Sequence, residues 1–426
     1  MSLRGVSVMK KVVNNALMLY LLTFSNYILY FLTIPYQTRI LGPELFGVVG
    51  FATALGLYLQ LFVSFGFTVS ATAEVARCGE GDERARIPAI FSRVFYSQIF
   101  LILLLVPIIM VAVSFLATFQ QHAVLFFLTF LSVSIAALMP DYIYRGTENM
   151  KAITIRAVVI RVIFTVLLFA FLKSPADYYM IPLFSALGGG VVLIAVYLDL
   201  RKKEMASFRF PGLLTLFRTL RESSMFFWSR IATNIYGATN TFIIGLIYGP
   251  ASAVMGLYVA ADKVMSAAKQ GITPVVDAVY PNAVKNKSLD LIKRSMIVIG
   301  PILVIGSLIV WIFAYDLAGW VLGSNFREAG QYIRLLIPIV PITFFSLILG
   351  FPALTVIGKA KHANLSVIVA SIFHVIILLI LHFTLGLTIV IICYVMILTN
   401  LLTLAYRTVI ILAYIRKANN SYSEGN

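Results

Sequence analysis

The chain has 426 residues, of which 61% are hydrophobic and only 12% are charged. This balance cannot supply both a buried core and a water-facing surface, so it excludes a soluble globular protein and indicates an integral membrane protein. The formal net charge of +16 would suit nucleic-acid binding in a soluble chain, but the positions of the basic residues explain it otherwise.

The apolar runs are about 20 residues long, which is the length of a membrane-spanning helix rather than of an alternating barrel strand. They predict an all-α, multi-pass (polytopic) membrane protein with about twelve transmembrane helices. The first six spans lie near residues 14–36, 45–70, 94–117, 123–144, 157–173 and 180–198. The next six lie near residues 224–248, 252–276, 295–316, 331–355, 365–383 and 387–407.

The order of spans divides the chain into two six-helix lobes. Residues 1–198 are predicted to form the N-terminal lobe, and residues 224–426 the C-terminal lobe with a short tail. Residues 199–223 are expected to form a cytoplasmic linker with an amphipathic helix. LGPELFGVVG at 41–50 and YGPASAVMGLY at 248–258 occupy matching places in the two halves, as internal repeats of a transporter would.

Basic residues are distributed very unevenly between the loops. Most of them fall on the side that holds both termini, whereas the other side holds only Arg39, Lys173, Arg327 and Arg334. Because loops rich in Lys and Arg stay in the cytoplasm, both termini are predicted to be cytoplasmic. The two cysteines are isolated in the sequence, and neither they nor the four histidines show the spacing of a metal site, so no metal and no cofactor is expected.

Residues 256–271, GLYVAADKVMSAAKQG, place ionisable side chains inside a predicted span. Each such group costs roughly 3 kcal/mol at membrane depth and therefore normally faces a cavity or a partner. On a helix, Asp262 and Lys269 share one face while Lys263 and Gln270 share the adjacent one, so together they could line a cavity. The alternative is that Asp262 and Lys269 neutralise each other while Lys263 extends to the membrane surface.

Three other spans carry polar side chains at helical spacing. Arg230 and Asn234 lie on a polar seam of the seventh span, Asn26 and Tyr30 lie in the first, and Gln60 lies in the second. Hydroxyl, amide and tyrosine groups suit sugar hydroxyls and ring faces, and Arg230 suits an anion. Bonds between neighbouring helices, and extension of Arg230 to the cytoplasmic surface, are the open alternatives.

Four segments together resemble one known family. They are IPYQTRILGPELFG at 34–47, MPDYIYRGTENMK at 139–151, GLYVAADKVMSAAKQGITPVVDAVYP at 256–281 and VLGSNFREAGQYIRLLIPIVP at 321–341. Their order over nearly the whole chain resembles the Wzx-type polysaccharide repeat-unit (O-antigen) flippases of the multidrug/oligosaccharidyl-lipid/polysaccharide (MOP) exporter superfamily. Tyr142 stands where that family often has a tryptophan.

The resemblance implies a MATE-like fold and a flippase of the bacterial inner membrane. Its substrate would be an undecaprenyl-pyrophosphate-linked oligosaccharide, moved from the cytoplasmic to the periplasmic leaflet by alternating access. The pyrophosphate and sugars would bind in a cationic central cavity. The residues expected to bind substrate are Arg230, Lys263, Lys269, Asn234, Gln270, Asn26, Tyr30 and Gln60, and those expected to serve gating or coupling are Arg39, Asp141 and Asp262.

The same resemblance leaves the coupling ion open between a proton and sodium, and implies a polysaccharide polymerase and a chain-length regulator as partners. One rival function is a MATE-like antiporter of drugs or organic cations, which should place unpaired carboxylates in its cavity. Another is a membrane-embedded polymerase or glycosyltransferase, which should need a sizeable outer loop or a carboxylate cluster. The basic residues within the spans and the short outer loops favour a transporter that is not an enzyme.

Overall fold

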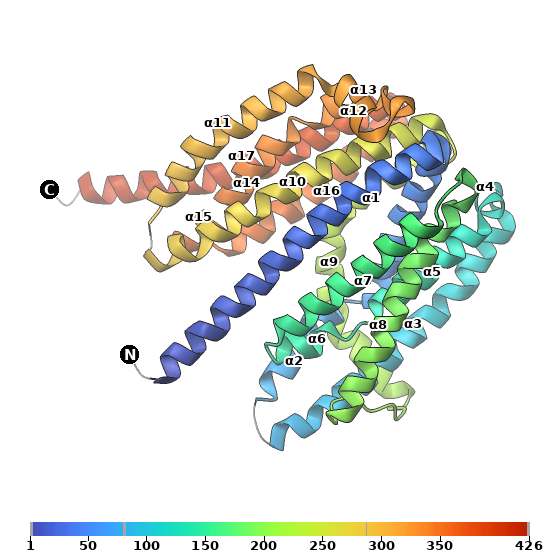
Figure 1. The fold of residues 1–426 in the computed structure, drawn as a ribbon. Helices are drawn as coiled ribbons and strands as arrows, with labels where there is room; N and C mark the ends of the chain where they lie inside the picture. Colours follow the sequence, from blue (N-terminus) through green and yellow to red (C-terminus); the bar gives the residue numbers. More distant parts are fainter. Residues whose placement is uncertain (1–2, 80–81, 287, 424–426) are drawn as a thin grey trace. The chain divides into compact units, whose positions relative to one another are not determined.

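A computed structural model describes residues 3–79, 82–286 and 288–423. Figure 1 shows that these residues form long helices. The chain is 88% helical, and the described residues contain no strand, which confirms the predicted all-α class. The structure divides into two compact units: residues 1–41 with 48–231, here called unit 1, and residues 42–47 with 232–426, here called unit 2.

Unit 1 contains the helices of the first half of the chain. α1 spans Leu3–Ser64 and bends at Gly42, whose φ of 69° lies in the left-handed region that glycine adopts without strain. The remaining helices are α2 (Phe67–Arg77), η1 (Asp82–Arg86), α3 (Ile87–Phe115), α4 (Ala117–Gln121), α5 (Ala123–Ala137), α6 (Asp141–Gly146), α7 (Met150–Phe171), η2 (Pro175–Tyr179), α8 (Met180–Lys202) and the first part of α9 (Leu213–Tyr248).

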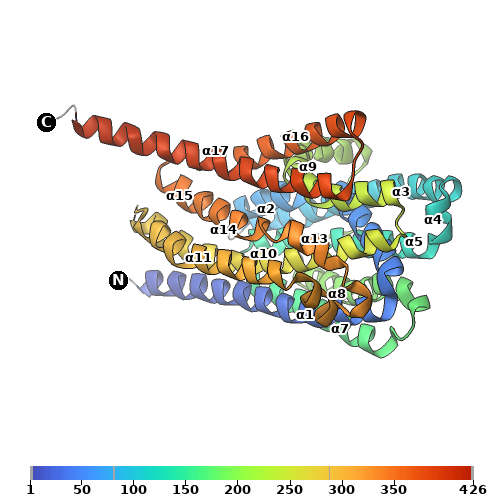
Figure 2. The ribbon, with the colours of Figure 1, turned by 90° about the horizontal axis from the view of Figure 1, so that it is seen from above.

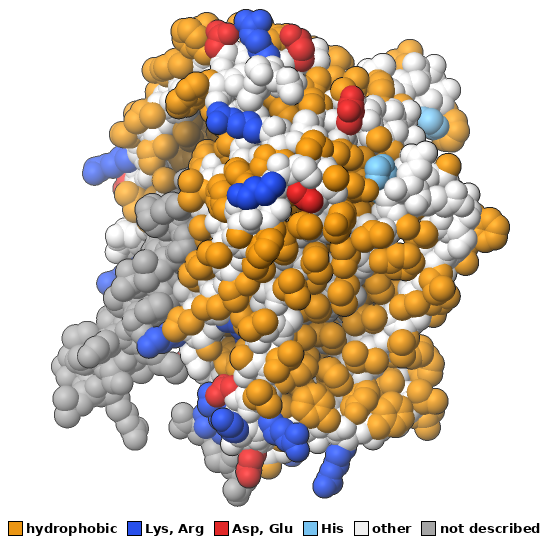
Figure 3. Space-filling view, turned by 45° about the vertical axis from the view of Figure 1, so that its right-hand side comes forward, with side chains coloured by type: hydrophobic (Ala, Val, Ile, Leu, Met, Phe, Trp, Pro, Cys, Tyr) orange, Lys and Arg blue, Asp and Glu red, His pale blue; other side chains and the backbone are white. Residues whose placement is uncertain are grey.

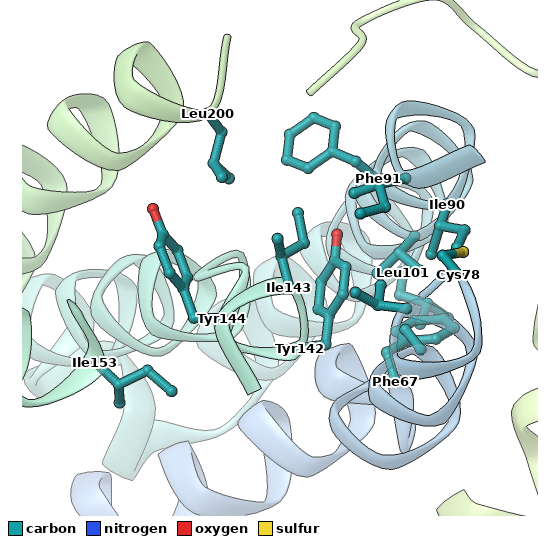
Figure 4. Close-up of a cluster of buried hydrophobic side chains, with 14 residues drawn as sticks. Phe67, Cys78, Ile90, Phe91, Leu101, Tyr142, Ile143, Tyr144, Ile153 and Leu200 are labelled. Carbon is teal, nitrogen blue, oxygen red and sulfur yellow. The ribbon is translucent and has the colours of Figure 1, made fainter. Parts of the chain in front are cut away.

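The core of unit 1 is a cluster of apolar side chains from α2, α3, α6 and α8. Phe67, Phe91, Tyr142, Ile143 and Leu200 are all buried and point toward one another in the close-up of Figure 4. Burying side chains of this size stabilises a fold by roughly 1.5–3 kcal/mol each. The end of the fourth predicted span therefore belongs to the packed interior of unit 1.

The connection after α8 is fastened to unit 1. Tyr96 donates a hydrogen bond of 2.6 Å to the carbonyl oxygen of Phe208, and Ser92 donates one to the carbonyl oxygen of Arg209. The Phe208 ring packs edge-on against Phe91, with 5.2 Å between ring centroids. This anchoring holds the start of α9 against unit 1.

The amphipathic segment predicted within the linker forms the first turns of α9. Leu214 is 88% exposed, and Arg218 and Arg221 are exposed as well. Such a helix start can lie among lipid headgroups with its apolar side chains in the bilayer. The division between the two units falls inside α9, between Ile231 and Ala232. The linker at 199–223 between two lobes stays a prediction.

Unit 2 contains the rest of α9 and the helices that follow it. These are α10 (Ala253–Asn286), α11 (Asp290–Ile312), α12 (Ala314–Leu322), η3 (Ser324–Phe326), α13 (Ala329–Leu336), α14 (Ile339–Leu349), α15 (Phe351–Val356), α16 (Lys361–Thr384) and α17 (Ile389–Ser423). α14 packs against α11 and α17, and α16 packs against α17 (Figures 1 and 2). The span predicted at 331–355 is interrupted at Pro338 and Gly350, so α13, α14 and α15 succeed one another there.

The described residues contain nine helical segments that are long and apolar enough to cross a membrane. α10 is not among them, because Asp262, Lys263 and Lys269 interrupt its apolar character. Figure 3 shows a continuous area of hydrophobic side chains with basic side chains at its lower edge, the pattern expected at the boundary between lipid and water. The protein is a multi-pass membrane protein, and the count of twelve spans stays a prediction.

Two basic residues that the sequence assigns to cytoplasmic loops have buried side chains. Arg156 in α7 is only 6% exposed, and Arg407 in α17 only 5%. Arg407 donates hydrogen bonds to the Ser366 hydroxyl at 2.9 Å and to the Ala363 carbonyl at 3.1 Å, and another to the Ser346 carbonyl. Its guanidinium thus joins α14, α16 and α17 within unit 2.

Replacing Arg407 by lysine is expected to destabilise the protein by about 2 kcal/mol, because an ammonium cannot reach acceptors on all sides of a planar guanidinium. Thermal unfolding in detergent micelles should show a fall of several degrees in the apparent Tm. Arg416→Lys is the matched control, since Arg416 is exposed on the same helix and should leave the Tm unchanged. Equal Tm values for both variants would show that the network around Arg407 contributes little.

Candidate functional site

The candidate site lies on α10, whose two sides differ in character. One side is buried and apolar, with Tyr258, Met265, Ile272 and Val276, and α10 packs against α13, α14 and α15. A helix in contact with three neighbours along one side is held rigidly. Its other side is thereby presented in a fixed orientation.

That other side is polar over much of the length of the helix. At 100° per residue, its polar side chains fall within an arc of about 120°. They are Asp262, Lys263, Ser266, Lys269, Gln270, Thr273 and Asp277, all partly or fully exposed, and together they are called here the polar face of α10. The predicted stripe of Asp262, Lys263, Lys269 and Gln270 is therefore present on one helix face.

Charge on the polar face is concentrated at Asp262, Lys263 and Lys269. The Asp262 carboxylate interacts electrostatically with both lysines. Between Asp262 and Lys269 two ammonium groups accompany one carboxylate, and the second carboxylate of the polar face, Asp277, lies about 12 Å beyond Lys269 along the helix axis, so this stretch carries a local excess of one positive charge. Because ionised groups at membrane depth are costly, this excess favours a function in which an anion or water meets the helix.

The other predicted substrate-binding residues fall elsewhere. Arg230 and Gln60 are partly buried in unit 1, whereas α10 belongs to unit 2. The side chains of Asn26, Tyr30 and Asn234 lie outside the described residues. The roles of these five residues in binding stay predictions.

The residues predicted to serve gating or coupling are in three different environments. Arg39 is exposed in α1, and Asp262 belongs to the polar face of α10. Asp141 forms an ion pair with the buried Arg156, whose guanidinium also lies 4.9 Å from the ring centroid of Tyr144. Sequence reasoning missed Arg156 as the partner of Asp141, although their spacing of fifteen residues across a turn between two helices makes contact feasible.

Unit 1 contains a polar hollow, which the sequence did not indicate. It has a volume of about 310 Å³ and is lined by residues of α2, α3 and α9. Arg93 lies there between two carboxylates, forming an ion pair with Glu74 and lying 3.9 Å from Glu222. Arg77 also lines this hollow, so two arginines face two glutamates and their charges balance. The hollow therefore suits an anion less well than the stretch of α10 between Asp262 and Lys269, where two lysines accompany one aspartate.

No group of three or more His, Cys, Asp or Glu side chains that could hold a metal ion occurs within the described part of the chain. The chemistry available on the polar face of α10 is binding rather than bond breaking. Ammonium groups can donate charge-assisted hydrogen bonds to an anion, and hydroxyl and amide groups can bind neutral polar ligands.

The chain is similar in sequence to proteins of polysaccharide export. The family model described as "Polysaccharide biosynthesis protein" matches residues 12–287, more than half of the chain. A protein of Escherichia coli (strain K12) described as "Putative O-antigen transporter" is 26% identical over 377 residues, covering 85% of this chain and 88% of that protein. A Shigella dysenteriae protein of the same description is also 26% identical, over 379 residues, covering 85% of this chain and 91% of that one.

Solved structures share the fold at low sequence identity. An inward-facing MATE family transporter of the MOP superfamily superposes with a TM-score of 0.64 at 14% identity, covering 92% of this chain and 99% of that one. The lipid II flippase MurJ, in an inward closed conformation, gives a TM-score of 0.63 at 11% identity, covering 92% and 86%. The fold is thus that of the MOP-superfamily transporters, as predicted.

Fold and sequence relatives agree on the class: the sequence relatives are described as transporters, and the fold is one that solved transporters share. Within that class, the chain belongs to the polysaccharide biosynthesis protein family. The resemblance inferred from the four sequence segments is confirmed by this membership.

Proposed function

We propose that the protein is a flippase for polysaccharide repeat units. Its substrate is an oligosaccharide linked to undecaprenyl pyrophosphate, and it moves this substrate from the cytoplasmic to the periplasmic leaflet of the bacterial inner membrane. The observation that carries the proposal is the local excess of positive charge at Asp262, Lys263 and Lys269 on the polar face of α10, in a chain whose relatives are described as O-antigen transporters.

The physical problem of such transport is desolvation. Each sugar hydroxyl that entered hydrocarbon without a hydrogen bond would cost several kcal/mol, so the headgroup needs a wet, polar surface while its lipid tail stays in the bilayer. Ser266, Gln270 and Thr273 offer neutral hydrogen-bonding groups along the polar face of α10. Lys263 and Lys269 offer charge-assisted hydrogen bonds to the pyrophosphate.

The membrane potential supplies a driving force for this direction of transport. Moving two negative charges outward across an inside-negative membrane is favourable by about 4–5 kcal/mol per 100 mV, provided that the carrier returns without net charge. In this proposal the binding site opens alternately to the two leaflets. A polysaccharide polymerase and a chain-length regulator then act on the exported units.

The main rival function is export of drugs or organic cations, which the MATE-like fold also accommodates. The local charge at Asp262, Lys263 and Lys269 argues against it, since two lysines beside one aspartate would repel a cationic substrate. Variants of Lys263 and Lys269 distinguish the two functions, because loss of these lysines should weaken export of an anionic substrate and not export of a cationic one.

The test is export by variants of the two lysines. The Lys263→Ala/Lys269→Ala double variant is expected to lower the amount of surface polysaccharide at least tenfold, because each lost charge-assisted hydrogen bond is worth about 1.5–3 kcal/mol. The measurement is immunoblotting of surface polysaccharide in cells that carry only the variant gene, with membrane insertion checked on the same samples. The Lys263→Arg/Lys269→Arg variant should retain most of the export.

Lys285→Ala is the matched control, because Lys285 is an exposed lysine in the last turn of the same helix. It should leave export within about twofold of the parent, which corresponds to less than 0.5 kcal/mol. Normal surface polysaccharide in the double variant would contradict the proposed function, and normal drug export together with absent polysaccharide export would favour the rival.

A further inference from the structure

A fully buried histidine lies at the meeting point of three helices in unit 2. His374 in α16 is 0% exposed, and its Nε2 atom lies 3.0 Å from Oδ1 of Asn240 in α9. Its Nδ1 atom lies 2.8 Å from the hydroxyl oxygen of Thr399 in α17. Asn240 and Thr399 are also buried, at 0% and 1% exposed. Both ring nitrogens are thus engaged with no access to lipid or bulk water.

The partners of His374 can serve both of its charge states. The Thr399 hydroxyl lies 2.7 Å from the carbonyl oxygen of Val395 as well as beside Nδ1. With a neutral ring, Nε2–H donates to Asn240 and the Thr399 hydroxyl donates to Nδ1. With a protonated ring, Nδ1–H donates to the Thr399 oxygen, and that hydroxyl turns to donate to Val395. Gain of a proton therefore requires only one hydroxyl rotation and leaves no hydrogen bond unmade.

Buried polar side chains connect this histidine to the polar face of α10. Thr241 follows Asn240 in α9 and is also buried. Tyr258 in α10 is 0% exposed, and its hydroxyl lies 3.6 Å from the sulfur of Met396, one turn before Thr399 in α17. Asp262 acts electrostatically on Tyr258 from one turn further along α10. Tyr258 therefore lies between the buried interior of unit 2 and the partly exposed Asp262 carboxylate, one turn away on α10.

We infer that His374 is a proton-binding site of the transporter, loaded through Asp262 and the Tyr258 region; the inference rests on the proposed function for its role in transport. The step is a simple proton transfer: a hydronium ion gives its proton to the Nδ1 lone pair, water is left behind, and the reverse step returns the proton. No electron and no other group moves.

Coupling follows from solvation. A buried positive charge is disfavoured when its surroundings are dry and becomes acceptable when water reaches it. A conformation that admits water to Asp262 and Tyr258 therefore loads His374, and one that seals them unloads it. A proton bound in only one conformation shifts the equilibrium between the two, which is the requirement for driving a transport cycle.

The other titratable groups on the packed helices leave His374 as the proton acceptor of this cluster. On α16 itself, His382 lies about two turns away and is exposed. On α17, Cys393 lies nearly two turns before Thr399, and Arg407 is about two turns beyond it with its guanidinium bound to Ser346 and Ser366. On α10, Tyr258 and Asp262 form the route described above, and on α9 the uncharged Asn240 contacts the ring.

The test is nitrogen NMR of the purified protein, labelled with ¹⁵N-histidine in detergent micelles. The chain has only four histidines, so their ring signals can be resolved, and His374→Gln identifies the signal of interest. If that variant does not fold, replacing His122, His362 and His382 together by glutamine leaves His374 as the single signal. The expected result is a reversible change of His374 from a single N–H to the doubly protonated ring between pH 8 and pH 5.

Two substitutions of Thr399 make the test specific. Thr399→Val removes the acceptor for Nδ1–H and should lower the proton affinity of His374 at least tenfold, whereas Thr399→Ser should preserve it. His382→Gln is the control on the same helix and should leave the His374 signal unchanged. A His374 ring that stays neutral down to pH 5, or that binds protons equally well in Thr399→Val, would overturn the inference.

The inference and the proposed function can fail separately. Proton binding is measured without any polysaccharide, whereas the proposed function depends on export by the Lys263 and Lys269 variants. Export should fall at least tenfold in His374→Gln and stay normal in His382→Gln. Normal export in His374→Gln would overturn the coupling role even where the NMR titration shows a bound proton.

Discussion

Replacing Gly256 by alanine is expected to destabilise the protein by about 3 kcal/mol, the upper end of the usual cost of overfilling a packed interior. A Cβ atom at Gly256 would lie only 1.7 Å from the carbonyl oxygen of Pro43, which is backbone and cannot swing aside. A Cβ at Gly47 would in turn lie 2.8 Å from the carbonyl oxygen of Pro250. The turn after Gly42 and the start of α10 therefore touch backbone to backbone within unit 2.

The measurement is the apparent Tm of the purified variant in detergent micelles. Gly271→Ala is the matched control, because Gly271 lies on the same helix and a Cβ there would meet nothing within 4 Å. That control should leave the Tm unchanged or raise it slightly, since alanine favours a helix over glycine by up to about 1 kcal/mol. Similar Tm values for Gly256→Ala and Gly271→Ala would contradict the close contact.

The contact at Gly256 shows what the sequence could and could not predict. LGPELFG and YGPASAVMG are visible in the sequence as weakly similar segments at matching places in the two halves. Their mutual packing was not predictable, because it depends on which turn of the chain meets which helix. Apolar runs of membrane length, by contrast, must be helical in any arrangement, so the all-α class followed from composition alone.

The candidate site divides in the same way. Asp262, Lys263, Lys269 and Gln270 were predicted to share a stripe because helix geometry is local and fixes the direction of each side chain from its spacing. The hydrogen bonds of His374 join α9, α16 and α17. Residue spacing could not predict them, because they depend on which helices pack together. A histidine and an asparagine inside apolar spans were the only signal available.

Basic residues illustrate a further limit. The positive-inside rule counts arginines near the ends of spans and says nothing about where each guanidinium points. Arg156 and Arg407 were counted as loop cations, yet both are buried against partners from other helices. The number of Lys and Arg residues on each side can predict the orientation of the protein in the membrane even when some of these residues have structural roles.

Replacing Arg156 by methionine is expected to destabilise the protein by about 3 kcal/mol. Removal of one partner of a buried ion pair costs about 3–5 kcal/mol, and the lower value applies because Asp141 is one-third exposed and can be partly hydrated. Loss of the contact between the guanidinium and the Tyr144 ring adds to the effect. The apparent Tm in detergent micelles is the measurement. Arg327→Met is the control. The side chains of Arg327 and Asp316 are both exposed, so their ion pair should contribute less than about 1 kcal/mol.

The double variant Arg156→Met/Asp141→Asn separates a structural role of Asp141 from a role in coupling. Removing both charges leaves no buried ion without a partner, so most of the lost stability should return, and the cycle should give an interaction energy of about 2 kcal/mol. If Asp141 acts only through its ion pair, surface polysaccharide should recover along with the Tm. If Asp141 also carries a coupling ion, as the sequence predicts, export should stay low in a protein whose stability has been restored. Export that recovers fully would leave Asp262 as the coupling carboxylate.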